Sequence, residues 1–287
     1  MSYEDKFDAS LSLLRRLHPK QITANLDNIC TLIQQNNGED ELVQDLLSSV
    51  DTPLKVVKCQ DTGKPFLCCD YNRDGDSYRS PCSNKYFPVQ ADDDELPPFP
   101  SNTIRQLEIK ANDAFDVYRD LYYEGSGISS VYLWDTEDDE TLDGFAGVVL
   151  IKKDTEDGSG KWNSIHVFEV IPESASTALY KLTTSVILDL KNNDDSSLSL
   201  AGSLTRQLET IQTLEVDGGS NLETSHLINL GTLVEKSEYN IRNLLQEVYF
   251  DKLKDIMLKD LRSVGDLGDQ KLENLKQSEL IKGLQGL

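Results

Sequence analysis

One long stretch of helical periodicity, from Leu222 to Arg262, constrains the fold more than any other part of the sequence. The stretch contains no proline, and its apolar residues fall on one narrow stripe at about 100° per residue: Leu227, Leu230, Val234, Ile241, Leu245 and Val248. A helix of roughly 40 residues would be about 60 Å long at 1.5 Å per residue. We therefore expect it to lie across a broad sheet, or across a sheet shared with a second chain.

The residues before this stretch divide into three parts. Three short apolar patterns in residues 1–52, separated by Pro19 and Gly38, predict a helical unit with short connections. Residues 53–100 predict a small segment of short strands and turns, with an acidic, proline-rich loop at its end. A helix with an aromatic face and a strand-rich region follow, and together with the long helix they make a predicted unit of residues 101–262.

The strand-rich region predicts the fold class. Its five candidate strands are Val131–Trp134, Gly144–Lys153, Trp162–Ile171, Ala178–Leu190 and Leu198–Leu208. Alternation within the third strand favours an antiparallel sheet covered mainly on one face. A meander of five strands followed by one long helix is an α+β arrangement. Residues 263–287, after the long helix, are predicted to form a separate C-terminal arm.

Composition and charge exclude several classes of function. The net charge is −22, which argues against sequence-independent binding of nucleic acid. Nine of the 28 basic and nine of the 50 acidic residues lie from Lys236 onward, so the C-terminal fifth is neutral and the rest carries the whole excess. We expect an acidic partner to be met by this end. No apolar run predicts a membrane span, and five cysteines, an odd number, favour reduced thiols in the cytosol.

Catalytic patterns are sparse. The three histidines, His18, His166 and His226, lie in unrelated settings, and no phosphate-binding glycine loop or nucleophile elbow is present. His166 most simply belongs to the sheet. We therefore expect no enzyme activity, no cofactor and no metal.

The segment from Asp70 to Ser77 leaves an alternative open. It resembles the start of a calcium loop, with Asp, Asn and Asp at the first, third and fifth positions and Gly75 at the sixth. The twelfth position should be Glu but is Pro81, and Arg73 puts a positive charge among the would-be ligands. The other interpretation is a turn whose carboxylates accept backbone N–H groups.

The C-terminal arm has moderate amphipathic character. Its apolar residues cover a broad sector of a helical wheel, which is too weak a pattern for a stable free helix of this length: Leu272, Leu275, Leu280, Ile281, Leu284 and Leu287. Two interpretations stay open. The arm packs on its own domain, or it lays its leucines into the groove of a partner.

Longer motifs run along almost the whole chain. They are residues 69–81, which read Cys-Asp-Tyr-Asn-Arg-Asp-Gly-Asp-Ser-Tyr-Arg-Ser-Pro, and residues 83–86, 46–51, 118–122, 131–134, 144–147 and 202–207. Together they resemble the β subunit family of F-actin capping protein. Cys82 stands where that family usually has Trp, and the chain has additional acidic residues in two loops, 91–95 and 136–143.

The resemblance implies an obligate heterodimer with a capping protein alpha subunit, built on a joint antiparallel sheet that a long helix from each subunit crosses. It implies calcium-independent binding to the barbed end of the actin filament, which blocks addition and loss of subunits there. The expected location is the cytoplasmic cytoskeleton, at cortical actin patches. The alternative is a calcium-binding or adaptor module with a partner other than actin.

The resemblance also implies site residues. The actin-binding residues would be Arg242 and, in the arm, Leu272, Leu275, Leu280, Ile281 and Leu284. Regulatory peptides would bind at Arg16, Asp51, Arg73 and Asp74. Phosphoinositide inhibition is a trait of the family, although the net charge of −22 argues against a general affinity for membranes.

Overall fold

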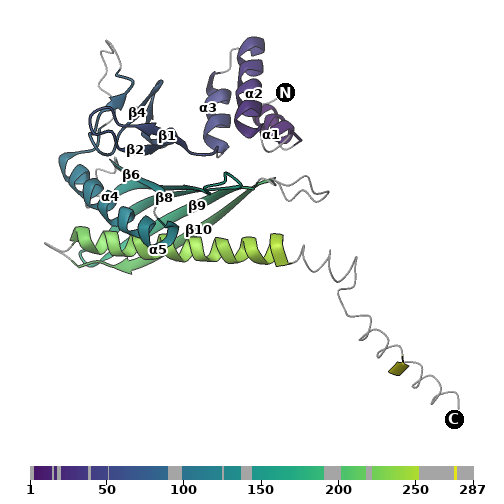
Figure 1. Cartoon of the computed structure of the whole chain (residues 1–287). Coiled ribbons are helices and arrows are strands. Elements are labelled where there is room, and N and C mark those ends of the chain that lie inside the picture. Colours follow the sequence, from purple (N-terminus) through teal and green to yellow (C-terminus); the bar gives the residue numbers. More distant parts are fainter. Residues whose placement is uncertain are drawn as a thin grey trace. The chain divides into compact units, whose positions relative to one another are not determined.

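The computed structural model of this 287-residue chain describes residues 3–14, 16–17, 21–37, 40–50, 52–89, 99–124, 126–136, 144–190, 202–217, 222–251 and 275–276. The chain forms two compact units, Met1–Glu238 and Tyr239–Leu287. The first unit contains the sheet and the helices that pack on it (Figure 1). None of the described helices is both long and apolar enough to cross a membrane.

The N-terminal segment forms the three helices that its apolar spacing predicts. They are α1 (Tyr3–Leu14), α2 (Ile22–Asn37) and α3 (Asp40–Ser49). They bury a small core between them, which consists mainly of Leu26, Ile29, Cys30, Leu42, Val43 and Leu46.

Residues 54–89, here called the strand–turn module, form two small sheets. Strands β1 (Lys55–Lys58) and β2 (Pro65–Cys68) make an antiparallel hairpin. The short helix η2 (Asp70–Asn72) leads into a second sheet, which contains β3 (Arg73–Asp74), β4 (Ser77–Arg79) and β5 (Tyr86–Phe87). The module has a small hydrophobic core of its own, which contains Cys59, Phe66, Cys68 and Phe87.

The main sheet is the expected five-stranded antiparallel meander. Helix α4 (Asn102–Tyr123) precedes β6 (Ile128–Asp135), β7 (Phe145–Asp154), β8 (Gly160–Ser174), β9 (Thr177–Leu190) and β10 (Gly202–Glu215). Neighbours in the sequence are neighbours in the sheet, in the order β10-β9-β8-β7-β6. The predicted bounds of the last strand, Leu198–Leu208, are wrong, because β10 continues to Glu215. Its second half has only two large apolar residues, Ile211 and Leu214, and they do not follow the alternation typical of a strand.

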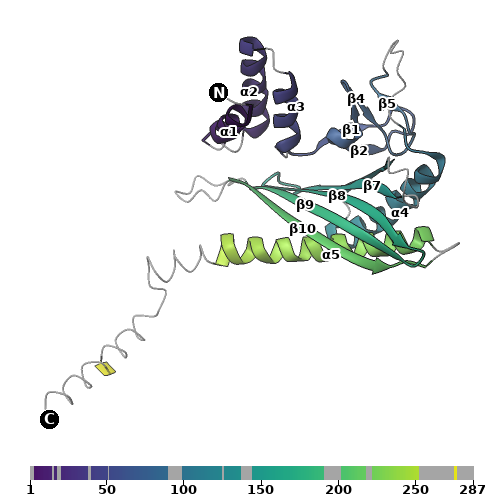
Figure 2. The ribbon, with the colours of Figure 1, turned by 180° about the vertical axis from the view of Figure 1, so that it is seen from behind.

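The sheet is covered mainly on one face, as expected, but a second and smaller core lies on its other face. Helices α4 and α5 (Leu222–Leu245) pack on one face, with Leu107, Phe115 and Leu230 in its core. The strand–turn module covers part of the other face, where Leu54 and Leu67 pack on a second core (Figure 2). Seven consecutive residues at the start of β7 are buried, as expected for a strand with both faces covered.

Close packing explains a glycine in one of the chain's motifs. A Cβ atom on Gly147, in β7, would lie 2.4 Å from Leu133 Cδ2, 2.6 Å from Phe168 Cζ and 2.7 Å from the carbonyl oxygen of Tyr132. These distances are far shorter than real carbon contacts. Only glycine therefore fits at this point of the sheet.

The long helix starts where predicted. Four residues of the expected apolar stripe, Leu230, Val234, Ile241 and Leu245, are buried. The α-helix ends at Leu245 and passes into a π-helical turn, Gln246–Asp251. The rest of the predicted stretch, residues 252–262, lies outside the described residues, as does the side chain of Val248. The buried stripe also contains three polar residues, His226, Ser237 and Glu238.

Candidate partner-binding surfaces

The loop at residues 69–79 takes its shape from a buried amide. The side chain of Asn72 accepts a hydrogen bond from the backbone N–H of Cys69 at 2.9 Å and donates one to the carbonyl of Arg79 at 2.9 Å. Gly75 has φ +53°, a conformation that favours glycine, and turns the chain from β3 into β4. Asn72 and Gly75 therefore serve the fold of the loop.

The acidic residues of this loop already face a cation of the chain. The guanidinium of Arg73 lies 3.9 Å from Asp70 and 4.0 Å from Asp76, and its Nε donates to the carbonyl of Gly75 at 2.7 Å. Asn72, the third would-be ligand, is turned into the fold. Within the described residues, no group of three or more His, Cys, Asp or Glu side chains is arranged to hold a metal ion. The arrangement gives the calcium alternative no support.

A buried ion pair joins the strand–turn module to α4. Arg79 donates two hydrogen bonds to the carboxylate of Glu108, at 2.8 and 2.7 Å, and Glu108 is completely buried. The same carboxylate accepts hydrogen bonds from Arg105 and from the backbone N–H of Leu133, the latter at 2.7 Å. Such paired, fully hydrogen-bonded charges fix geometry, and removing one partner leaves the other uncompensated. The ion pair of Arg79 with Glu108 thus positions the strand–turn module on α4 and β6.

The residues expected to bind regulatory peptides fall on two parts of the chain. Arg73 and Asp74 form β3, where Arg73 is exposed and Asp74 half-buried. Arg16 is exposed in the turn after α1. Asp51 lies outside the described residues. The structure therefore brings Arg73 and Asp74 together, and it places Arg16 with the N-terminal helices.

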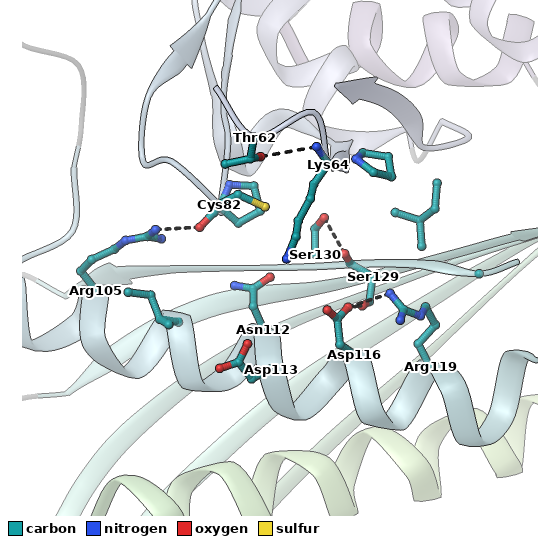
Figure 3. Close-up of a pocket in the computed structure, with 15 residues that line it drawn as sticks. Thr62, Lys64, Cys82, Arg105, Asn112, Asp113, Asp116, Arg119, Ser129 and Ser130 are labelled. Atoms are coloured by element: carbon teal, nitrogen blue, oxygen red, sulfur yellow. Dashed lines mark hydrogen bonds and ion pairs between the residues drawn. The ribbon is translucent and has the colours of Figure 1, made fainter. Parts of the chain in front are cut away.

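A cavity of about 520 Å³ lies between the strand–turn module, α4 and β6. Its walls include three basic residues, Lys64, Arg105 and Arg119, and two acidic residues, Asp113 and Asp116 (Figure 3). None of the predicted site residues that the structure describes lines it. Sequence reasoning missed this cavity because its walls come from three separate segments of the chain.

Three internal contacts involve charged residues in the walls of this cavity. Asp116 is paired with Arg119 at 2.7 Å and accepts a hydrogen bond from Ser129 at 2.7 Å. Arg105 donates to the carbonyl of Pro81 at 2.7 Å. The contacts of Ser129 with Asp116 and of Arg105 with Pro81 hold α4 against β6 and the module, and they fix the positions of these side chains in the cavity walls.

The residues expected to bind actin lie in the second unit. Arg242 is half-buried in the last turn of α5. Leu275 belongs to a helical segment of the arm, and 61% of its surface is exposed. The other expected arm residues, Leu272, Leu280, Ile281 and Leu284, lie outside the described residues.

A buried polar cluster, which the sequence did not reveal, ties α5 to the sheet. Glu238 accepts hydrogen bonds from Tyr118 at 2.8 Å, Tyr123 at 2.6 Å and Ser164 at 2.8 Å. Its Oε1 also lies 3.2 Å from Nε2 of His166. His166 is fully buried in β8, as its expected place in the sheet implied. One feature of the sequence could have indicated this cluster. Glu238 lies on the apolar stripe of the helix, four residues after Val234 and three before Ile241.

The surroundings of Glu238 favour its charged form. Burial by itself raises the pKa of the carboxyl, but the hydrogen bonds and charge of His166 and the hydroxyls of Tyr123 and Tyr118 outweigh burial and lower it to about 2. The first unit therefore holds a buried carboxylate at neutral pH.

The outer edge of the sheet is a long strand with no neighbour on one side. All 14 residues of β10 pair with β9, and within the described residues no strand pairs with its other edge. From Gln207 to Glu215 no residue of β10 is buried, and Ile211 exposes 68% of its surface. An exposed edge of this length is a template for pairing with another chain.

Comparison with known proteins gives relatives along the full length of the chain. The chain is 71% identical over 295 residues to the F-actin-capping protein subunit beta of Debaryomyces hansenii, with 100% of this chain and 99% of the relative covered. It is 48% identical over 293 residues to the subunit beta of Saccharomyces cerevisiae, with 98% and 99% covered.

A solved structure has the same fold at low sequence identity. It is the homodimeric actin capping protein alpha subunit from Plasmodium berghei, with a TM-score of 0.51 and 14% identity over 89% of this chain and 97% of that one. The family model described as F-actin capping protein, beta subunit, matches residues 7–257. The five-stranded meander, the crossing helix and the full-length relatives agree, and the chain belongs to the F-actin capping protein beta subunit family.

Proposed function

We propose that this chain pairs with an alpha subunit of capping protein and that the dimer binds the barbed end of the actin filament, without calcium, and blocks addition and loss of subunits. The role is binding and not catalysis. The observation that carries the proposal is the 14-residue outer edge of β10, which has no partner strand among the described residues, in a chain of this family.

The edge of β10 supports the pairing. A strand of this length with one open edge exposes a row of backbone N–H and C=O groups on that side. Such an edge usually makes a monomer prone to aggregation. A partner strand of the same fold would satisfy these groups and extend the sheet. The Plasmodium alpha subunit, which has a similar fold, is homodimeric. We therefore place the alpha subunit against β10.

Charge and exposure support the actin contacts. Arg242 lies in the neutral C-terminal region of an otherwise acidic chain, so this end repels an acidic partner least. In the arm, burial of four leucines contributes about 6–12 kcal/mol before the cost of ordering them. That gross gain is too small for a tight complex on its own. Arg242 and the alpha subunit would supply the remaining contacts.

Regulatory peptides would bind residues in the N-terminal part of the chain. The exposed surface of β3, with Arg73 and Asp74, together with Arg16 and Asp51 of the N-terminal segment, is proposed to bind regulatory peptides. Phosphoinositides would inhibit the dimer by competing for its basic actin-binding residues. The corresponding location is the cytoskeleton, at cortical actin patches.

The test follows growth of actin from preformed filament seeds. The full-length chain, co-expressed with its alpha subunit, is compared with a version that lacks residues 271–287 and with Arg242→Glu. We expect full-length protein to stop growth at concentrations far below that of actin, the truncation to weaken capping and Arg242→Glu to slow association. Lys236→Glu, which makes the same charge change six residues earlier on another face of α5, is the control. An unchanged association rate for Arg242→Glu would remove Arg242 from the contact surface.

A further inference from the structure

Two turns of the strand–turn module lie side by side. Residues 59–64 join β1 to β2, and residues 80–85 join β4 to β5. In each turn a backbone hydrogen bond links the first and last residues, at 2.9 and 2.8 Å. An ion pair between Asp61 and Lys85, at 2.8 Å, connects the two turns.

Each of these turns carries one cysteine. Cys59 is 1% exposed, and its Sγ lies 3.3 Å from Oγ of Ser83 in the other turn. Cys82 is exposed and lines the cavity, where Figure 3 shows it close to Thr62. The hydroxyl of Thr62 lies within hydrogen-bonding reach of both thiols. The two cysteines therefore lie in adjoining turns beside a common residue, and Cys82 is reached from solvent while Cys59 is enclosed.

The two thiols differ in reactivity. Burial by itself raises the pKa of Cys59, but hydrogen bonds from Ser80, Ser83 and Thr62 outweigh burial and lower it to about 6. At neutral pH this sulfur is largely a thiolate, which is the nucleophilic form. The walls of the cavity desolvate Cys82 and raise its pKa. Cys59 is thus the stronger nucleophile, and Cys82 is the thiol that a reagent in solution can reach.

We propose that Cys59 and Cys82 form a reversible disulfide by exchange with low-molecular-weight disulfides such as glutathione disulfide. In the first step the sulfur of Cys82 loses its proton, attacks one sulfur of the reagent and releases a glutathione thiolate, which takes up a proton. In the second step the thiolate of Cys59 attacks the sulfur of Cys82 in this mixed disulfide, and the second glutathione leaves as a thiolate. The two cysteines are oxidised, and one glutathione disulfide is reduced to two glutathione molecules.

The remaining cysteines are poor participants. Burial raises the pKa of both Cys68 and Cys69 to about 12, so these adjacent thiols stay protonated. Cys30 is buried among the N-terminal helices, and burial raises its pKa as well. The disulfide would tie together two turns at the wall of the cavity, one of which directly follows β4. Cys59 and Cys82 are therefore a proposed site of reversible oxidation that would link two turns of the strand–turn module.

The test uses the full-length chain co-purified with its alpha subunit. The complex is equilibrated with mixtures of reduced and oxidised glutathione, alkylated and digested, and the peptides are identified by mass spectrometry. We expect a cross-linked pair of peptides containing Cys59 and Cys82, with the loss of two hydrogen atoms, and its return to free thiols in excess reduced glutathione. Cys82→Ser should abolish the cross-link. Cys59→Ser should leave glutathione attached to Cys82.

A control variant and a comparison distinguish disulfide formation from loss of packing. Cys69→Ser is the matched control and should form the cross-link as the unchanged chain does. Because Cys59 lies in the core of the module, its substitution also removes packing, so the comparison of Cys82→Ser with the unchanged chain decides the matter. The proposal is overturned if both thiols stay free to alkylation at every ratio of the two glutathione forms. Glutathione that persists on Cys82 in the unchanged chain would overturn it as well.

Discussion

The strongest consequence of the structure concerns Glu238, whose carboxylate holds α5 against the sheet. We expect Glu238→Gln to lower the free energy of unfolding by on the order of 3 kcal/mol. The pKa of this carboxyl is lowered from its usual 4.5 to about 2, and one pKa unit corresponds to about 1.4 kcal/mol. A glutamine of the same shape can still accept some of the hydrogen bonds, but it loses the charge that His166 and the two tyrosines stabilise.

The pH dependence has a defined sign. A carboxyl whose pKa is lower in the folded chain stabilises the fold fully at pH values above about 4.5, and this stabilisation is lost as the pH falls toward about 2. The difference in free energy of unfolding between the original chain and Glu238→Gln should therefore be constant near neutral pH and shrink below about pH 4.5. Taking the difference removes the contribution of other carboxylates that titrate in the same range.

The assay is urea unfolding of the complex with the alpha subunit, at fixed protein concentration because association adds to stability. Glu235→Gln is the matched control: Glu235 lies three residues earlier on α5, is exposed and also accepts a hydrogen bond from a tyrosine, Tyr122. We expect Glu235→Gln to change the free energy of unfolding by less than about 1 kcal/mol. Equal effects of the two substitutions, or a difference that does not vary with pH, would refute the reasoning.

Three other predictions follow from the packing and the sheet edge. Gly147→Ala should lower the free energy of unfolding by about 1–3 kcal/mol, because a Cβ collides with Leu133, Phe168 and a backbone oxygen, whereas Gly231→Ala, with open space around its Cβ, should raise it by up to about 1 kcal/mol in the same urea assay. Arg79→Lys should cost about 1.5–3 kcal/mol, since lysine keeps the charge but cannot form the two-pronged pair with Glu108; a change below about 0.5 kcal/mol would contradict this. The chain expressed without an alpha subunit should aggregate on gel filtration because the outer edge of β10 has no partner strand among the described residues, and a monodisperse, folded monomer would count against the proposed pairing.

Local patterns predicted much of the fold. The helices and the meander follow from apolar periodicity and from turn residues, and four residues of the long-helix stripe are buried as expected. The sequence did not predict the end of β10. An edge strand that is exposed along much of its length needs no alternation of apolar residues. The cover on the second face of the sheet also did not follow, since it depends on Leu54 and Leu67, which are distant in the sequence from the strands they contact.

The candidate sites were harder to predict, for a physical reason. Glu238 and His166 are 72 residues apart, and nothing in the local pattern of either residue indicates the other. The turns that carry Cys59 and Cys82 belong to two separate sheets and meet through contacts between distant residues, Asp61 with Lys85 and Cys59 with Ser83. The loop at Asp70 is a local case, because Arg73, which the sequence places among the would-be calcium ligands, lies 3.9 Å from Asp70 and 4.0 Å from Asp76.

The most direct test of the capping proposal is to watch single actin filaments by fluorescence microscopy while the complex with the alpha subunit is added. Each filament distinguishes its two ends by their growth rates, so the affected end is seen directly. The proposal predicts that fast-growing ends stop both growing and shortening while slow-growing ends continue, with or without calcium. Fast-growing ends that keep elongating at saturating concentrations of the complex, or arrest confined to slow-growing ends, would contradict it.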